Sequence, residues 1–289
     1  MTRRFAALVA LIGVAAVAGA QQWPASWTAA QPPLQLFGNV YYVGARGVSA
    51  ILITSADGHV LLDGPMQENV SMVVSNIKAL GFRIEDVKLI LNSHAHFDHA
   101  GGIAELQRLS GATVAARAWS SHVLTQGRSG PDDPQYGVVP EIPAVRSVQT
   151  IAAGETLRVG LLALTAHATA GHTPGGTSWT WRSCQDGRCV DMVYADSLTA
   201  ASGERFLFTR STMYPTVLRD FDASFSTIAA WPCDILLTPH PEVSSLWQRI
   251  ARRDQGDADA LVDQAACARY VESARAALRA RIDREMKTP

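Results

Sequence analysis

The chain has 289 residues, which is enough for one large α/β domain or two small ones. It is 47% hydrophobic and 18% charged, a composition that suits a globular core and argues against long disorder. The formal net charge is −1, so the sequence gives no electrostatic case for nucleic-acid binding, which needs a concentrated basic surface.

The first twenty residues have the pattern of a secretory signal peptide. Thr2-Arg3-Arg4 supplies a positive n-region, residues 5–17 are almost all apolar, and Ala18-Gly19-Ala20 is a small-residue cleavage site. The alternative is a membrane anchor, but the apolar run is shorter than the ~20 residues of a transmembrane helix. We therefore expect export to the periplasm, by general secretion rather than the twin-arginine route. The mature chain would comprise residues 21–289, without stable membrane association.

Four β-strands are predicted between residues 35 and 63, where short apolar runs alternate with turn residues. A helix is expected from Glu68 to Leu80, because apolar residues recur there at helical spacing and Gly81 follows. Residues 87–91 are typical of a short buried strand, and a second helix is expected over 103–109.

Residues 127–146 are rich in Gly, Pro and Asp, which indicates a long surface loop of the kind that often borders an active site. The pattern then repeats, with strands expected near 157–166, 177–182, 190–195 and 234–238, and helices near 217–231 and 257–285. Two strand-rich segments, each followed by helices, predict an α/β fold with two similar halves. The expected architecture is a four-layer αβ/βα sandwich, in which two mixed sheets face each other and helices lie outside.

The chain has four cysteines, and an even number in an exported protein suggests two disulfides. Cys184 and Cys189 flank a polar turn, so we expect them to pair. Cys233 and Cys267 remain, and their disulfide would join a strand start to the C-terminal helix with a stabilisation of about 4 kcal/mol. A cysteine zinc site is the alternative, but no Cys-x-x-Cys spacing or nearby His accompanies them.

The most informative motif is His94-Ala95-His96-Phe97-Asp98-His99, directly after the strand at 87–91. α/β folds usually hold their sites at the carboxyl ends of strands. Side chains alternate in an extended segment, so His94 and His96 face the same way and can bind one ion. Asp98 and His99 are adjacent and diverge, so they can reach a second ion. Imidazole and carboxylate are good zinc ligands, and three protein ligands leave a position open for water. The motif thus predicts a zinc site rather than a solvated polar loop.

Two zinc ions need six ligands, and the motif supplies four. His172 and His240 each lie in a sharp turn after a predicted strand, and we expect them to complete the set. The other three histidines, His59, His122 and His167, are expected to be surface or packing residues. Of these, His167 could contact the metal ligands from outside the site.

These segments resemble the metallo-β-lactamase superfamily and, within it, the third subclass of class B (zinc) β-lactamases. The resemblance rests on His-x-His-x-Asp-His, on Gly-His-Thr-Pro-Gly-Gly at 171–176 and on Thr-Pro-His-Pro at 238–241, with further similar segments at 38–44, 175–181, 194–200 and 233–241. It covers about residues 35–270, so residues 21–289 are expected to form one metallo-β-lactamase domain.

The resemblance implies two zinc ions, the first held by His94, His96 and His172 and the second by Asp98, His99 and His240. Ser197 stands where the first two subclasses have a cysteine ligand. Ser197 and Thr199 would then offer hydroxyl groups to the substrate carboxylate, and Gln135 is a further candidate for substrate contact.

Asp196 leaves a second interpretation open. Other hydrolases of the superfamily use an aspartate in a Gly-Asp-x motif to bridge the two metals. Ala195 in place of that glycine, and the sequence from Ser197 to Thr199, favour the β-lactamase interpretation, in which Asp196 is structural.

The resemblance implies hydrolysis of the β-lactam amide bond of penicillins, cephalosporins and carbapenems by a zinc-bound hydroxide, with Asp98 orienting the nucleophile, and hence antibiotic resistance. The expected partner is this small-molecule substrate, and the expected state is a monomer. Two alternatives stay open: an exported thioesterase or lactonase of the same superfamily, and a non-catalytic periplasmic zinc-binding protein.

Overall fold

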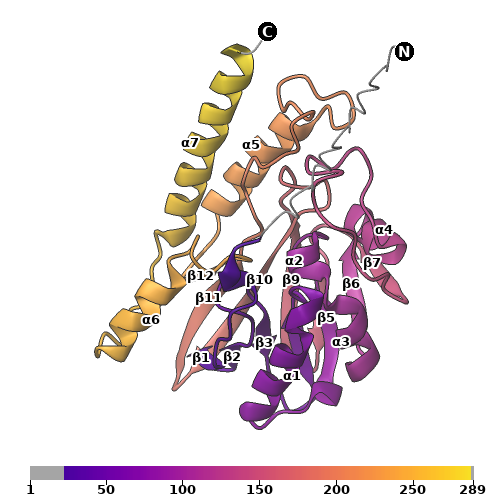
Figure 1. Cartoon of the computed structure of the whole chain (residues 1–289). Coiled ribbons are helices and arrows are strands. Elements are labelled where there is room, and N and C mark those ends of the chain that lie inside the picture. The colour runs from indigo at the N-terminus through magenta and orange to yellow at the C-terminus, as the bar shows by residue number, and fades with distance from the viewer. Residues whose placement is uncertain (1–22, 288–289) are drawn as a thin grey trace, which may run out of the picture.

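The computed structural model describes residues 23–287, so the predicted signal peptide lies outside the described residues. Two β-sheets face each other and helices lie on their outer sides (Figure 1). The first sheet has the strand order β1-β2-β3-β4-β5-β6-β7 and the second β12-β11-β10-β9-β8. The strands are β1 (Leu34–Phe37), β2 (Val40–Tyr42), β3 (Ile51–Ile53), β4 (His59–Leu62), β5 (Val87–Leu91), β6 (Thr113–Arg117), β7 (Val148–Ile151), β8 (Thr156–Val159), β9 (Leu162–Ala168), β10 (Thr177–Gln185), β11 (Arg188–Tyr194) and β12 (Ile235–Leu237).

Both sheets are mixed. Strands β1 to β4 pair antiparallel and β4 to β7 pair parallel, while β12 is parallel to β11 in an otherwise antiparallel second sheet. Helices α1, α3 and α4 pack on the first sheet, and α5 and α7 on the second. The helices are α1 (Val70–Ala79), α2 (Phe97–Ala100), α3 (Ile103–Ser110), α4 (Ala118–Gln126), α5 (Val217–Ala229), α6 (Leu246–Asp254) and α7 (Ala266–Lys287). The predicted four-layer sandwich is confirmed.

The core between the sheets also positions the site. Its largest fully buried side chains include Tyr42, Trp179 and Tyr194, and burying an aromatic ring of this kind stabilises a fold by up to about 3 kcal/mol. The Nε1 of Trp179 donates a hydrogen bond to the carbonyl of Asn92 at 3.1 Å. The inter-sheet core therefore fixes the start of the chain segment that carries the histidine motif.

Two expected elements differ from the structure. The strand expected near 157–166 is a hairpin of β8 and β9, because Gly160 adopts a left-handed φ of 54° and turns the chain. The helix expected over 257–285 begins only at Ala266, because residues 255–265 form turns. In one of them the backbone N–H of Ala260 donates a hydrogen bond to the backbone carbonyl of Asp257. Helix α6 precedes these turns and was not predicted.

Strands β6 and β7 were not predicted either. In β6 two of the five residues are alanine, which has low strand propensity, so the local signal is weak. The pairing of β6 with both neighbours in a parallel sheet determines its conformation instead. Residues 127–146 lie between α4 and β7 and contain no helix or strand, in agreement with the predicted loop.

Both disulfides are present. Cys184 and Cys189 join the paired ends of β10 and β11, and Cys233 and Cys267 join the start of β12 to the first turn of α7. Disulfides persist in oxidising compartments, so they suggest an exported protein. Within residues 23–287, no helix combines the length and the apolar character needed to cross a bilayer.

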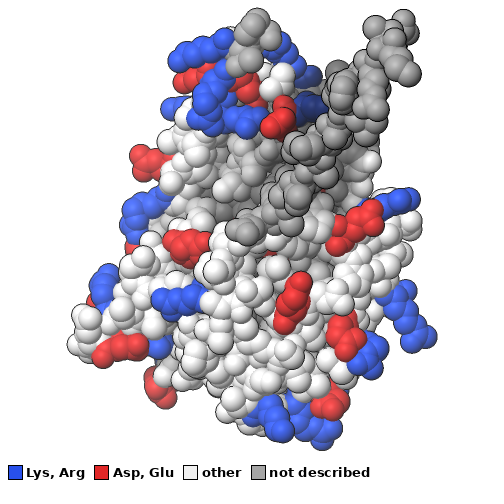
Figure 2. Space-filling model, in the orientation of Figure 1, with Lys and Arg blue, Asp and Glu red and all other residues white. Residues whose placement is uncertain are grey.

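The C-terminal end of α7 is held by a buried carboxylate. Lys and Arg side chains gather around this end of the helix (Figure 2), and Glu285 accepts hydrogen bonds there from Arg281 Nε at 2.6 Å and from the backbone N–H groups of Phe208 and Thr209 at 3.2 and 2.9 Å. Burial opposes the charge, but Arg281 and these N–H groups outweigh it and lower the pKa of Glu285.

We expect Glu285→Gln to lower the free energy of unfolding by about 2 kcal/mol at neutral pH, because the amide nitrogen would face a donor. A lowered pKa stabilises the fold above the ordinary pKa of the group, and this contribution is lost as the pH falls through the folded-state value. The gap between variant and parent in urea unfolding should therefore shrink in acid. Glu272→Gln, on the exposed side of α7, is the control. A gap that grows in acid would contradict the assignment.

Candidate metal centre

The six predicted ligands lie together at one edge of the two facing sheets. His94 and His96 follow β5, and His172 lies in the turn between β9 and β10. His240 comes directly after β12. Residues 94–99 were predicted to be extended, but α2 begins at Phe97, so Asp98 and His99 lie on its first turn. Asp98 still lies beside both His99 and His240.

His94, His96 and His172 form a first triad. One ring nitrogen of each lies within 4.8 Å of the corresponding atoms of the other two. Their opposite ring nitrogens have other partners. His94 Nδ1 lies 2.7 Å from Asp196 Oδ1, and His96 Nε2 lies 3.1 Å from Asp133 Oδ2. His172 Nδ1 donates to the carbonyl of Thr199 at 2.8 Å. These bonds orient the three rings so that the remaining nitrogens face one another.

Asp98, His99 and His240 form a second triad. Asp98 Oδ2 lies 3.2 Å from His99 Nε2 and 3.4 Å from His240 Nε2, and the two imidazole nitrogens are 3.2 Å apart. Ligands at 2.0–2.1 Å from a tetrahedral zinc ion are separated by about 3.4 Å. The spacing of the three donor atoms therefore fits a zinc ion. His94 also lies within 4.8 Å of Asp98 and His99, so the two triads adjoin.

The pKa shifts of His94, His172 and Asp98 favour a metal, whereas the pKa values of His96 and His240 are raised because burial is outweighed by Asp133 and Asp98, respectively. Burial lowers the pKa of His172 to about 3 and holds that of His94 well below its ordinary value, and neighbouring imidazoles lower both further. Burial opposes the charge of Asp98, but His99 and His240 outweigh it and keep the pKa of Asp98 well below its usual range. Neutral imidazoles and an ionised carboxylate are the forms that bind zinc.

Asp63 supports this arrangement from behind the second triad. It is fully buried and accepts hydrogen bonds from the backbone and hydroxyl of Ser93 and from the hydroxyl of Tyr194, each at 2.7 Å. Its Oδ2 lies 4.0 Å from His99 Nδ1. Burial raises the pKa of Asp63 to about 6. The sequence showed Asp63 only as the end of a strand and gave no signal for this contact.

Two of the three expected substrate contacts, Gln135 and Thr199, lie beside the first triad. The side-chain nitrogen of Gln135 is 3.4 Å from both His96 Nδ1 and His172 Nε2, so the long loop brings it directly to the triad. The hydroxyl of Thr199 lies 3.1 Å from His172 Nδ1, on the far side of that ring. Ser197 is buried in the same segment.

The three remaining histidines lie away from the triads. His122 is exposed on α4, and the buried His59 packs against Phe82. His167 bonds to Thr180 and packs on the ring of Trp231, so it does not lie behind the ligands.

An aromatic wall that was not predicted from the sequence lies on the side of His240. The ring of Trp27 stacks on His240 with 5.0 Å between centroids, and Trp23 stacks on Trp27 at 5.5 Å. The backbone N–H of Gly47 donates to the carbonyl of Ser26 and anchors this N-terminal segment. Two tryptophans soon after the predicted cleavage site were the available signal, but they lie before the first predicted strand.

Asp196 bonds to the outer nitrogen of His94 rather than lying between the triads. Gly176 allows this approach, since a Cβ there would lie 2.6 Å from Asp196 Oδ2. Burial raises the pKa of Asp196 to about 6. Asp196 therefore has the geometry of a residue that positions His94.

We expect Asp196→Asn to weaken zinc binding at the first triad by about 10–100-fold while two zinc ions still bind at saturation. Competition with a chromophoric chelator would measure both quantities. Asp222→Asn, on an exposed side chain of α5, is the matched control. Loss of both ions in Asp196→Asn would instead identify Asp196 as a bridging ligand.

Comparison with known proteins places this geometry in a family. The model described as the metallo-beta-lactamase superfamily matches residues 43–262. The structure is similar to that of the Rm3 metallo-beta-lactamase, with 53% identity, a TM-score of 0.90, and coverage of 91% of this chain and 98% of the other. It is also similar to MEM-A1, a subclass B3 metallo-beta-lactamase from a soil metagenome library, with 47% identity, a TM-score of 0.89, and coverage of 91% and 100%.

A curated relative matches a shorter part. The Ribonuclease TTHA0252 of Thermus thermophilus is 33% identical over 132 residues, which are 44% of this chain and 30% of that protein. The match spans less than a third of that relative, whereas the structural matches cover nearly their whole chains.

Proposed function

This chain belongs to the metallo-β-lactamase superfamily, and we propose that it hydrolyses the amide bond of β-lactams with two zinc ions, one in each triad. The observation that carries the proposal is the pair of adjoining triads. In the second triad, the distances between the donor atoms of Asp98, His99 and His240 are those of a tetrahedral zinc site. The likeness to subclass B3 enzymes over more than 90% of the chain supports a β-lactam as the substrate.

When bound, zinc supplies a hydroxide near neutral pH by lowering the pKa of coordinated water to about 7, and it polarises the substrate carbonyl. The chain's own residues do the positioning. Asp196, Asp133 and the carbonyl of Thr199 fix the three imidazoles of the first triad. Asp98 is the one carboxylate among the six ligands, so it can accept a hydrogen bond from the attacking water and orient it.

Other residues would bind the substrate. The amide of Gln135, at the first triad, is placed to donate to the β-lactam, and the hydroxyls of Ser197 and Thr199 would meet its carboxylate. The ring of Trp27 provides an apolar wall beside His240. Binding of the substrate carboxylate on one side and of an apolar substituent on the other would hold the amide bond over the triads.

The proposal extends to the biological setting. A periplasmic enzyme, exported by the segment 1–20 and acting as a monomer on penicillins, cephalosporins and carbapenems, would confer antibiotic resistance. The two disulfides support an oxidising compartment.

The test is a substrate panel with the purified chain 21–289 loaded with zinc. We expect turnover of nitrocefin, benzylpenicillin and imipenem, with kcat/KM for nitrocefin in the enzymatic range of about 10⁴–10⁸ M⁻¹ s⁻¹. A thioester and a lactone should be turned over far more slowly. Inert β-lactams with rapid thioester or lactone hydrolysis would favour the esterase alternative, and no turnover with tight zinc binding would favour a zinc-binding protein.

A further inference from the structure

A cavity of about 420 Å³ lies between α6 and α7, behind the chain segment that follows β11. None of the six predicted ligands lines it. Its volume falls within the range of about 300–1,000 Å³ that is typical of small-molecule sites.

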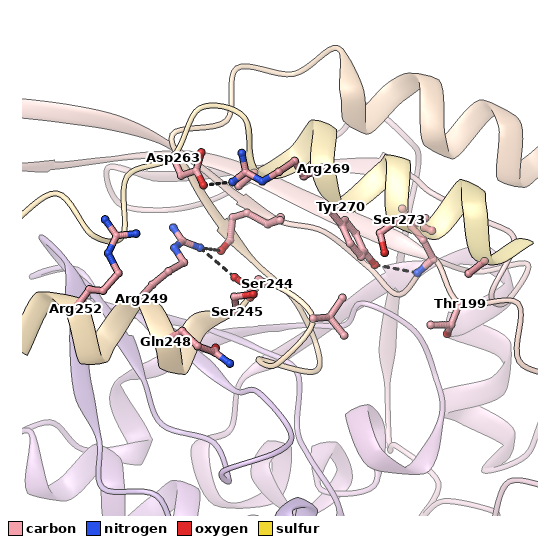
Figure 3. Close-up of a pocket in the computed structure, with 16 residues that line it drawn as sticks. Thr199, Ser244, Ser245, Gln248, Arg249, Arg252, Asp263, Arg269, Tyr270 and Ser273 are labelled. Atoms are coloured by element: carbon pink, nitrogen blue, oxygen red, sulfur yellow. Dashed lines mark hydrogen bonds and ion pairs between the residues drawn. The ribbon is translucent and has the colours of Figure 1, made fainter.

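Positive charge gathers at one end of this cavity. Figure 3 shows three guanidinium groups there, those of Arg249, Arg252 and Arg269, and one carboxylate, that of Asp263. The side chains of Arg252 and Arg269 are 63% and 59% exposed, so they stand at the mouth. Each has an acidic partner, Asp257 and Asp263 respectively, but a guanidinium has five N–H donors and can accept a further anion.

Arg249 adds a buried charge to this end. Its guanidinium donates to four backbone carbonyls, those of Leu236, Ser244, Ala260 and Leu261. None of these four acceptors is a carboxylate, so Arg249 is hydrogen-bonded but not neutralised by them. Asp263, the one carboxylate that lines the cavity, attracts Arg249 but pairs directly with Arg269, so an anion at the mouth would reduce the remaining cost of burying this charge.

The opposite end of the cavity is mostly apolar, although Thr199 and Ser273 also stand there (Figure 3). Leu198, Ala274 and Ala277 line it together with the ring of Tyr270. A ligand that fits both ends therefore has an anionic group and an apolar body.

The apolar end touches the segment behind the zinc site. The hydroxyl of Tyr270 donates to the carbonyl of Asp196 at 2.7 Å. It also accepts from the N–H of Leu198 at 3.0 Å, the bond drawn in Figure 3. The same segment orients two rings of the first triad, because Asp196 bonds to His94 and the carbonyl of Thr199 accepts from His172. A ligand in contact with Leu198 and Tyr270 would shift the groups that hold these rings.

We propose that this cavity is a second binding site, for an organic carboxylate with an apolar body, and that its occupation slows the zinc site through Tyr270 and residues 196–199. The anion pairs with Arg252 and Arg269, and the apolar body lies against Leu198 and Ala277. Residues 196–199 carry the groups that orient His94 and His172, and Thr199 lines the cavity as well. Because the orientation of the zinc ligands is not restored by saturating substrate, occupation of the cavity lowers kcat.

Isothermal titration calorimetry of the zinc-loaded chain with 4-phenylbutyrate tests the binding. We expect Arg252→Gln with Arg269→Gln to weaken binding about tenfold or more, since two charge-assisted contacts are lost. Ala277→Trp fills the apolar end and should also weaken it. Arg219→Gln with Arg279→Gln makes the same charge change on exposed residues outside the cavity and should bind as the parent does. The neutral 4-phenylbutyramide should bind more weakly than the carboxylate.

If all variants bind 4-phenylbutyrate equally, the compound binds elsewhere, for example on zinc, and the proposal is overturned. The proposal is also overturned if 4-phenylbutyramide binds as tightly as the carboxylate. The effect of the ligand on catalysis is measured with nitrocefin as the substrate, so this experiment rests on the proposed function. A fall in kcat, absent in the Arg252→Gln, Arg269→Gln variant, supports the coupling, whereas a rise in KM with kcat unchanged refutes it. Calorimetry needs no hydrolysis, so the binding site and the proposed function can fail separately.

Discussion

Removal of zinc from the loaded enzyme is expected to abolish nitrocefin hydrolysis and to lower the melting temperature. The two triads join the ends of β5 and β12 and the turn between β9 and β10, so metal binding links segments from both sheets. At free zinc about 100 times the Kd, each site adds about 2.7 kcal/mol of stability. For a chain of this size, that corresponds to a loss of roughly 5–10 °C per site. Dialysis against a chelator, followed by calorimetry and an activity assay, measures both effects.

Restoring zinc should restore both quantities, while adding magnesium should not, because the donor set is rich in imidazole and magnesium prefers oxygen ligands. The melting temperature provides a readout that does not depend on the identity of the substrate. Hydrolysis that survives complete removal of metal would contradict the proposed mechanism. An unchanged melting temperature would contradict the assignment of the triads.

The elements of this fold that the sequence predicted correctly are those with a strong local pattern. The meander before residue 63, α1 and β5 each combine regular apolar spacing with a clear turn or glycine at the end. Gly81 and Gly111 both follow a predicted helix and adopt the left-handed φ that such ends favour. Strand β6 lacks such a pattern, and its position between β5 and β7 is a property of the whole sheet.

The same distinction holds for the candidate site, where the metal ligands could be predicted from the sequence and the residues that support them could not. The ligand types and their spacing pointed to His94 through His99, and the remaining histidines in strand-end turns completed the set. The second layer could not be predicted, because its members come from distant segments and are ordinary polar residues. Asp63 is 30 residues before Ser93, and Asp133 meets His96 only through the path of an irregular loop. Trp27 was not predicted either, because its stacking on His240 joins segments that are far apart in the chain.

Asp98→Asn is expected to lower kcat/KM by about 10²–10⁴-fold and to reduce bound zinc from two ions to one. The substitution keeps the shape of the side chain but removes the one negative charge of the second triad. Asp98 Oδ2 lies 3.2 and 3.4 Å from the donor nitrogens of His99 and His240, so the charge that is lost is the one closest to both. Zinc content by mass spectrometry under native conditions and steady-state kinetics with nitrocefin measure the two effects.

The control is Asp254→Asn, which makes the same chemical change on an exposed side chain. Asp254 forms an ion pair with the neighbouring Arg253. It should retain two zinc ions and the activity of the parent. The size of the loss in Asp98→Asn also separates two roles of the residue. If kcat falls while two ions remain bound, Asp98 acts by orienting the nucleophile and not by holding the metal. If two ions remain and kcat/KM is unchanged, the second triad is not the centre of the reaction, and hydrolysis would have to depend on His94, His96 and His172 alone.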